Sequence, residues 1–456
     1  MSLDKSLKQV FQNAYDQNQW IEVLANVFGH GRVSFKAEPV SETLSNTQQQ
    51  LAQSVEKVGG VKLESGQELP FYEVQLNPRI KVERNRVGIN DLVKNVMLRG
   101  STTEGALAVF YYPPEEEKPE WRFSFVSKEA GSEFFNELEQ KETKPKRYTY
   151  VFGTDEGHKT AIDRFHSLSD SGLTLENLFE AFSVQRVSDE FFQEYRNVYL
   201  EFVQFLTGKR LQKNKGKYEE EKVQAPSNFL NLVFNNDEKA ARDFCKKLIG
   251  RVVFLYFLQK KGWLGASIDN ENWDDGYNDF LHRLFEESCK QEDFYNQWLS
   301  EVFFNTLNTS RSNDAFTMPD GREVKMPYLN GGLFDDSNEP NKHKVIAFPP
   351  YLFENLFDLL DSYNFTVYED SPEDHIVAVD PEMLGHIFEN LLEDNKEKGT
   401  YYTPKEIVHY MSQESLIEYL YTHLNKQAPK TYKQFGNPQT IPFGNEKKKG
   451  QLALEE

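Results

Sequence analysis

ALAVFYY at residues 106–112, WRFSFV at 121–126 and RYTYVF at 147–152 decide the fold of the first part of this chain. Aromatic and β-branched residues favour strands because they pack well on a pleated, half-buried surface. The acidic, proline-bounded residues 113–119 (PPEEEKP) predict a solvated loop between the first two runs. We therefore expect a sheet within the first 155 residues.

The residues before these runs alternate between helical and strand patterns. Residues 5–24 carry apolar side chains near helical spacing, which predicts a helix. Residues 61–64 and 69–76 read as two strands joined by a turn at Ser65 and Gly66. Residues 90–98 again look helical. The pattern predicts an α/β domain over residues 1–155.

Residues 156–225 are expected to form a helical connector. Aromatic side chains such as Phe191, Tyr195 and Phe202 recur at helical spacing, with Ser188 or Asp189 as the candidate N-cap. Residues 208–222 (GKRLQKNKGKYEEEK) are charged and poor in apolar side chains, which predicts a linker or an exposed helix end.

Residues 226–395 predict a mainly helical domain. One long helix should cover residues 244–259 and end at Gly262 in a left-handed conformation. Near the end of the domain, Asp380 is the expected N-cap of a helix with Pro381 in its first turn. Residues 396–456 would begin a further domain, so the fold class is mixed α+β.

Composition limits the class of protein. Among 456 residues, Lys and Arg total 52 and Asp and Glu total 72, which gives a net charge of -20. This excludes a uniformly basic nucleic-acid module but leaves room for a local basic patch. The two cysteines, Cys245 and Cys289, fall in predicted amphipathic helices and are expected to be buried thiols. We find no secretory segment and no long apolar run, and we expect a cytoplasmic protein.

The most informative segment for function is GTYYTPKEIVHYM at residues 399–411, after DPEMLGHIFENLL at residues 380–392. Thr403 can cap a helix, Pro404 fits its first turn, and Glu406 completes the spacing of a capping box. A helix start of this kind presents free N–H groups to an anionic ligand. On physical grounds alone, a well-capped helix with a packed tyrosine pair is the favoured explanation of the segment.

This segment resembles the entry to the methyltransferase domain of adenine-specific DNA methyltransferases, and in particular of type IIG restriction–modification enzymes. The resemblance implies that Tyr401, Tyr402, Thr403 and Pro404 bind the methionine end of S-adenosylmethionine. Residues 251–264 (RVVFLYFLQKKGWL) and 327–334 (PYLNGGLF) are similar to the helical region before that domain. The implied partner is double-stranded DNA, the implied role is phage defence, and no protein partner is indicated.

Two parts of the family pattern are missing. The chain has neither the glycine-rich cofactor loop nor the Asn-Pro-Pro-aromatic motif that receives a flipped adenine, and its Asn-Pro pairs lie at Asn77 and Asn437. We expect an N-terminal fragment with a truncated Rossmann-like methyltransferase domain. The complete protein would methylate adenine N6.

In type IIG enzymes an N-terminal nuclease of the PD-(D/E)xK type commonly uses acidic side chains to hold Mg²⁺. Here Glu73 and Gln75 lie two apart on a predicted strand, and the hairpin could bring Glu64 near Glu73. Glu64, Glu73 and Gln75 are therefore candidate catalytic residues, with Glu73 the candidate metal ligand. The usual aspartate is missing, and Gln75 stands where the family has lysine.

Candidate DNA contacts follow from positive charge: Arg84, Arg86, Lys209, Arg210 and Lys213. Three interpretations of residues 61–76 stay open: a solvated structural hairpin, an active nuclease site and a degenerate nuclease fold. For the whole chain, the alternative function is a non-catalytic DNA- or partner-binding module fused to a methyltransferase. A third possibility is an interaction scaffold unrelated to DNA.

Overall fold

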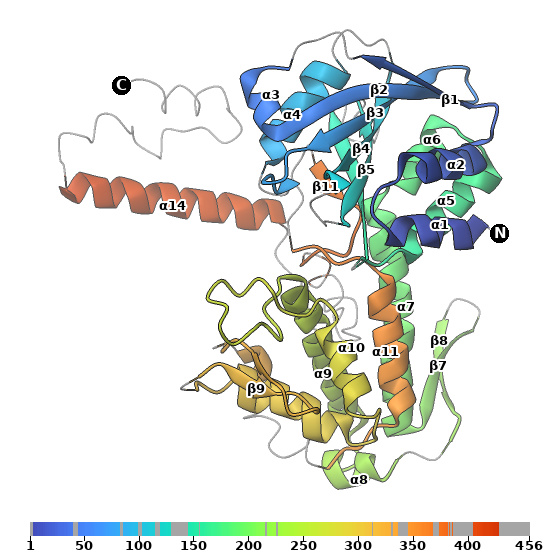
Figure 1. Ribbon diagram of the computed structural model, residues 1–456. Helices are drawn as coiled ribbons and strands as arrows, with labels where there is room; N and C mark the ends of the chain where they lie inside the picture. The colour runs from blue at the N-terminus through green and yellow to red at the C-terminus, as the bar shows by residue number, and fades with distance from the viewer. Residues whose placement is uncertain are drawn as a thin grey trace. The chain divides into compact units, whose positions relative to one another are not determined.

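A seven-stranded mixed sheet organises the first part of the chain (Figure 1). Its strands follow the order β1-β2-β3-β4-β5-β6-β11. Every neighbouring pair is antiparallel except β3 with β4 and β6 with β11. The strands are β1 (Val33–Pro39), β2 (Ala52–Lys62), β3 (Glu68–Leu76), β4 (Gly105–Tyr111), β5 (Trp121–Ser127), β6 (Lys146–Phe152) and β11 (Asp374–Ile376).

The computed structural model divides the chain into two units, Met1–Leu391 and Leu392–Glu456. It describes residues 3–39, 44–82, 85–98, 103–114, 119–128, 145–154, 156–214, 217–224, 227–311, 313–329, 332–335, 345–367, 374–381, 383, 385 and 405–427. The sheet and the helices that follow it belong to the first unit. In the described residues, no helix is long and apolar enough to cross a membrane.

Helices cover both faces of the sheet, which explains why β4 is buried along almost its whole length. Leu107 and Val109 of β4 face one apolar cluster, while Ala106, Ala108 and Phe110 face another. On the first face lie α1 (Leu3–Gln12), α2 (Gln17–Phe28), α5 (Lys159–Ser171) and α6 (Leu175–Ala181). On the second lie α3 (Asn46–Leu51), α4 (Arg86–Leu92) and a π-helical turn, Val93–Met97. The mixed α+β class expected from the sequence is confirmed.

The region predicted as one helix over residues 5–24 is two helices. Residues 13–16 interrupt it, and the Asp16 carboxylate caps α2 by accepting a hydrogen bond from the Gln19 backbone N–H at 2.9 Å. Asp16 adopts an extended conformation, as N-cap residues do. The break matters because it carries Tyr15 and Gln17 to the surface of β3.

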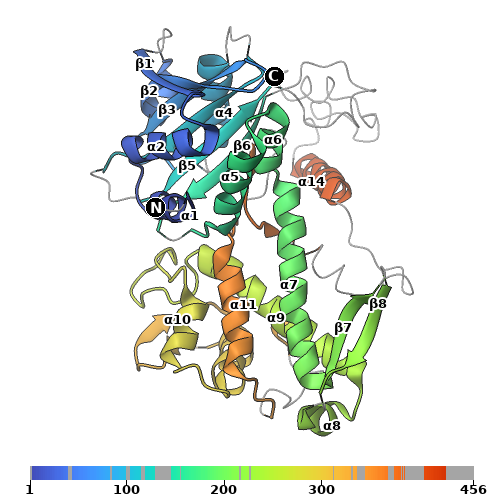
Figure 2. The same cartoon turned by 90° about the vertical axis from the view of Figure 1, so that its right-hand side faces the viewer.

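Long helices form the next part of the first unit. α7 (Val184–Thr207), α9 (Glu238–Lys260) and α11 (Pro350–Ser362) pack through one apolar cluster (Figure 2). Gly262 has a positive φ of 73°, as predicted for the end of α9. The predicted N-cap of α7 is wrong, because the Ser183 hydroxyl accepts from the Arg186 N–H and the helix begins before Ser188. The shorter helices are α8 (Asn228–Phe234) and α10 (Phe280–Glu287), with two π-helical segments (Phe294–Leu299 and Glu301–Leu307) and a 3-10 turn (Gly332–Phe334). A small separate sheet is formed by β9 (Ala315–Thr317), which pairs with β10 (Glu323–Lys325).

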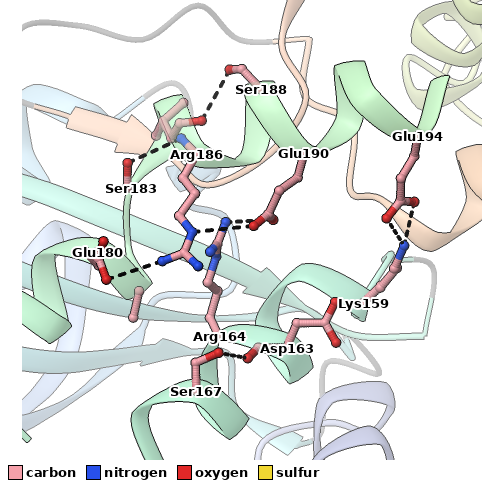
Figure 3. A network of polar contacts seen from close by, with 12 residues as sticks. Lys159, Asp163, Arg164, Ser167, Glu180, Ser183, Arg186, Ser188, Glu190 and Glu194 are labelled. Atoms are coloured by element: carbon pink, nitrogen blue, oxygen red, sulfur yellow. Dashed lines mark hydrogen bonds and ion pairs between the residues drawn. The ribbon is translucent and has the colours of Figure 1, made fainter. Parts of the chain in front are cut away.

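Ion pairs join α5 and α6 to α7 (Figure 3). Arg164 of α5 is 3% exposed and donates to Glu190 of α7 at 2.7 Å. Lys159 meets Glu194 at 2.5 Å, and Arg186 lies 3.3 Å from Glu180 of α6. These contacts fix the long helix against the helices that cover the sheet.

Residues 209–222 form a β-hairpin, so the prediction of a linker or helix end was wrong. β7 (Lys209–Asn214) pairs antiparallel with β8 (Lys217–Lys222). Gly208 ends α7 in the left-handed conformation, with a φ of 70°. The register places Arg210 opposite Glu221, and opposite charges across a strand pair favour the hairpin.

The cysteine prediction was half right. Cys245 is buried within α9. Cys289 is exposed and lies in a turn after α10, with a φ of 61°. The helical spacing continued past the point where the backbone leaves the helix, so sequence periodicity placed this thiol in the core wrongly.

Residues 374–380 return to the sheet from far along the chain. Asp374 of β11 is 2% exposed and accepts from Arg147 of β6 at 2.9 Å. Asp380 then caps the next helix turn, because its carboxylate accepts from the Met383 N–H at 3.0 Å, as predicted. Most of the helix expected after Asp380 lies outside the described residues. In the second unit, the described residues form α14 (Lys405–Gln427).

Candidate functional site

Glu73 is a carboxylate held inside the first face of the sheet. It lies in the middle of β3 and is 6% exposed. The Tyr15 hydroxyl donates to its Oε1 at 2.6 Å, and the Gln17 amide donates to Oε1 and Oε2 at 3.0 and 2.9 Å. The break between α1 and α2 therefore satisfies both oxygens of one buried acid.

A second carboxylate faces Glu73 across the strands. Glu56 of β2 lies directly opposite Glu73, and Gln75 pairs with Ser54 on β2 and Tyr111 on β4. Glu56 is exposed, whereas Gln75 is half-buried. The Tyr15 and Tyr111 rings lie 4.8 Å apart, so aromatic side chains close one side of the acid pair.

Burial is the largest cause of the pKa shifts of Glu73, Tyr111 and Tyr15. It raises the pKa of Glu73 above its ordinary value, the hydrogen bonds from Tyr15 and Gln17 oppose that shift, and the charge of Glu56 adds to it. Burial, with the nearby Glu73 charge, raises the pKa of Tyr111 to about 12. The Tyr15 pKa is raised for the same two reasons. Tyr15 is thus a hydrogen-bond donor at every physiological pH.

The expectation that the hairpin brings Glu64 near Glu73 is wrong. Lys62 pairs with Glu68 and Glu56 with Glu73, so Glu64 lies at the turn, several residues along the ladder from Glu73. At about 3.4 Å per residue this separation exceeds any direct contact. Glu64 instead meets Arg32 at 3.4 Å and is 44% exposed.

The candidate DNA contacts are dispersed. Arg86 is 17% exposed and lies 3.6 Å from the buried Asp374, so it faces an ion pair and not an open surface. Lys209 contacts Glu238 at 2.7 Å. Arg210 and Lys213 lie on β7, opposite Glu221 and Tyr218. Arg84 is outside the described residues.

The predicted cofactor residues Tyr401, Tyr402, Thr403 and Pro404 also lie outside the described residues. α14 begins at Lys405, directly after Pro404.

The acids around Glu73 do not match a Mg²⁺ centre as they are arranged. Across the part of the chain that is described, no three His, Cys, Asp or Glu side chains come close enough to hold a metal ion. Both oxygens of Glu73 already accept hydrogen bonds from neutral donors. Mg²⁺ prefers octahedral oxygen coordination, and Glu73 and Glu56 with the amide of Gln75 supply only part of that.

Sequence reasoning missed Tyr15, Gln17, Glu56 and Tyr111. Tyr15 and Gln17 sit in what was expected to be a continuous helix, and nothing in the local sequence ties them to β3. Counting along the ladder from the pair Lys62 and Glu68 without a bulge would place Lys57 opposite Glu73. A bulge between Lys57 and Gly59 places Glu56 there instead.

The sequence of this chain is distantly similar to that of a known protein. Over 260 residues the chain is 26% identical to a protein of Methanocaldococcus jannaschii named "Putative type II restriction enzyme and methyltransferase". The match covers 55% of this chain and 21% of that protein, so the chain spans about a fifth of the relative's length. The match supports a distant relationship to restriction–modification enzymes. No protein-family model and no solved structure matches the chain.

Proposed function

We propose that this chain is part of a type IIG-like restriction–modification protein that acts on double-stranded DNA in phage defence. The similarity over 260 residues to a relative whose name joins restriction and methylation carries this proposal. The sequence GTYYTP at residues 399–404 supports it independently, because it resembles the cofactor segment of adenine-specific DNA methyltransferases.

In the complete protein, S-adenosylmethionine would donate a methyl group to adenine N6. Tyr401, Tyr402, Thr403 and Pro404 would hold the methionine end of that cofactor. The Asn-Pro-Pro-aromatic motif that receives a flipped adenine in that family does not occur in this sequence.

The N-terminal sheet would serve as a nuclease-like module that grips DNA. From α2 to β4 the chain forms β1, the short helix α3, the antiparallel strands β2 and β3, the helix α4 and then β4, which is parallel to β3, and Glu73 lies on β3. The arrangement around Glu73 argues against cutting, because its carboxylate already accepts hydrogen bonds from Tyr15 and Gln17. We derive no cleavage step through Mg²⁺ from these residues.

DNA cleavage is the second candidate function. One observation favours it: Glu56 and Glu73 lie directly opposite each other with Gln75 two residues along, which gathers two carboxylates and an amide on the neighbouring strands β2 and β3. Cleavage by this group would require Glu73 to give up its present hydrogen bonds.

The complete protein decides between these functions. Methyl transfer from labelled S-adenosylmethionine to duplex DNA tests the first, and nicking with and without Mg²⁺ tests the second. Glu73→Gln should leave methylation unchanged, and Glu22→Gln on the exposed side of α2 is its matched control. Mg²⁺-dependent cleavage lost in Glu73→Gln but not in Glu22→Gln would establish the nuclease. Absence of methylation by the complete protein would refute the main proposal.

A further inference from the structure

An open hollow of about 530 Å³ runs along the exposed side of α1. Its walls consist of side chains that donate hydrogen bonds or carry positive charge: Lys5, Lys8, Gln9, Gln12, Asn13 and Thr154. Lys5, Lys8 and Gln12 follow one another at spacings of three and four residues, which places them on one side of the helix. The hollow is therefore a row of donors along one helix.

The charge of the hollow differs from that of the chain. The chain carries a net charge of -20, yet no carboxylate is among the described residues that line this hollow. Two ammonium groups and three amides are the side chains that bind phosphate oxygens in protein–DNA contacts. A local excess of positive charge on an acidic protein points to an anionic partner.

A short segment of backbone, held in place by hydrogen bonds, connects the hollow to Tyr15, which donates a hydrogen bond to Glu73. The Asn13 backbone carbonyl accepts from the indole N–H of Trp121 at 3.0 Å, and the Phe11 carbonyl accepts from the Gly153 N–H at 2.9 Å. Both bonds fix the end of α1 to the sheet. A single residue, Ala14, separates Asn13 from Tyr15, so the backbone between them spans at most about 7 Å.

We propose that this hollow binds the phosphodiester backbone of duplex DNA and guides it past Glu73. The inference rests on the proposed function, and it assigns DNA contact to Lys5 and Lys8 in place of the dispersed cations predicted from the sequence. The backbone of DNA fits because it offers a repeated series of phosphates to an open, elongated surface, whereas a closed site would suit a single small anion. Gln9 and Gln12 supply neutral donors beyond the lysines, and the Asn13 amide, which also donates to the Gln9 carbonyl at 2.6 Å, adds its remaining N–H.

The test uses the complete protein and a fluorescent duplex. The variant pair Lys5→Gln and Lys8→Gln is compared with Lys36→Gln and Lys94→Gln, two exposed lysines outside the hollow that give the same change of charge. Binding is measured by anisotropy over a series of salt concentrations, with circular dichroism to verify folding. Losing two phosphate contacts should weaken binding about tenfold and lower the slope of log K against log salt by about 1.8.

The control pair should change affinity less than twofold, with the slope intact. Equal binding by the two variant pairs would overturn this inference and leave the proposed function standing. Failure of the wild-type protein to bind any duplex at low salt would overturn both. A polyglutamate peptide serves as a further probe: if it binds through Lys5 and Lys8 while DNA does not, the hollow is a peptide site and the inference fails.

Discussion

Glu56 and Glu73 lie directly opposite each other on β2 and β3, yet Glu56 is exposed to solvent whereas Glu73 is buried, with an exposed fraction of 6%. Two like charges at this spacing destabilise a strand pair. The difference arises because Tyr15 and Gln17 cover Glu73 and donate to both its oxygens. The stability of the sheet should therefore respond to pH through Glu73.

Removing the Tyr15 hydroxyl tests this. Because the pKa of Glu73 is higher in the folded state than its ordinary value, binding of a proton to Glu73 stabilises the folded protein. This stabilisation is complete below the ordinary carboxyl pKa and is lost as pH rises through the folded-state pKa. Tyr15→Phe removes a donor to the ionised acid and should destabilise the protein by about 1–3 kcal/mol at pH 8. The loss should shrink at pH 4, where the acid is neutral. Thermal unfolding at both pH values measures it.

Tyr111→Phe is the matched control, because it deletes the same hydroxyl from the ring that packs on Tyr15. We expect a smaller shift with weaker pH dependence. Equal effects of the two variants at both pH values would show that Tyr15 acts through packing alone.

Glu56→Gln should stabilise the protein, which is the opposite of the effect expected for Tyr15→Phe. It removes the charge that raises the Glu73 pKa, so stability at pH 8 should increase. Because Glu56 is exposed, solvent and salt screen the effect, and we expect about 0.2–0.5 kcal/mol, declining as ionic strength rises. Glu68→Gln on the same hairpin is the control: it faces Lys62, so it should not stabilise. A salt-independent gain would contradict the electrostatic origin.

Gly59 should control the register that creates this pair. A Cβ at Gly59 would lie 2.1 Å from the Ser34 carbonyl oxygen, which belongs to backbone and cannot easily move. Gly59→Ala should therefore displace β1 or the bulge and lower the unfolding temperature strongly, with a cost of more than about 1 kcal/mol. Gly31→Ala, where nothing lies within 4 Å, should be nearly neutral. Similar stabilities of the two variants would remove the steric argument.

The ion pair between Arg147 and Asp374 should hold β11 on the sheet. Asp374→Ala would leave the Arg147 guanidinium buried without its carboxylate, at a cost of about 3–5 kcal/mol. The double change Asp374→Ala with Arg147→Met should recover much of that loss, because the buried charge is gone. Thermal unfolding and proteolysis near residues 374–380 report the result. A double variant as unstable as the single one would show that the pair itself, and not the unpaired charge, dominates.

The sequence predicted what depends on local periodicity. The strong strand patterns at residues 106–112, 121–126 and 147–152 correspond to β4, β5 and β6, because apolar and aromatic residues there are buried on both faces. The long helix ending before Gly262 was found for the same reason. The break at residues 13–16 was missed, since apolar spacing continues across it.

Features that depend on distant contacts could not be predicted. β11 joins the sheet from residue 374 through Arg147, and no local signal indicates that pairing. The position of Glu56 depends on one bulge, and a shift of a single residue exchanges the two faces of a strand. The sequence therefore pointed to Glu73 and Gln75 as candidates, while the side chains around Glu73 were not predicted.

The cofactor segment gives the last prediction. If Tyr401 and Tyr402 line the S-adenosylmethionine pocket, Tyr402→Ala in the complete protein should weaken cofactor binding about tenfold or more, because a buried aromatic contact contributes on the order of 1–2 kcal/mol. Calorimetry measures the affinity, and methyl transfer should fall in parallel at low cofactor concentration. Tyr419→Ala removes an exposed tyrosine of α14 that is 63% accessible and serves as the control. Binding unchanged in Tyr402→Ala, or reduced equally in both variants, would mean that the tyrosine pair packs the helix start and does not contact the methyl donor.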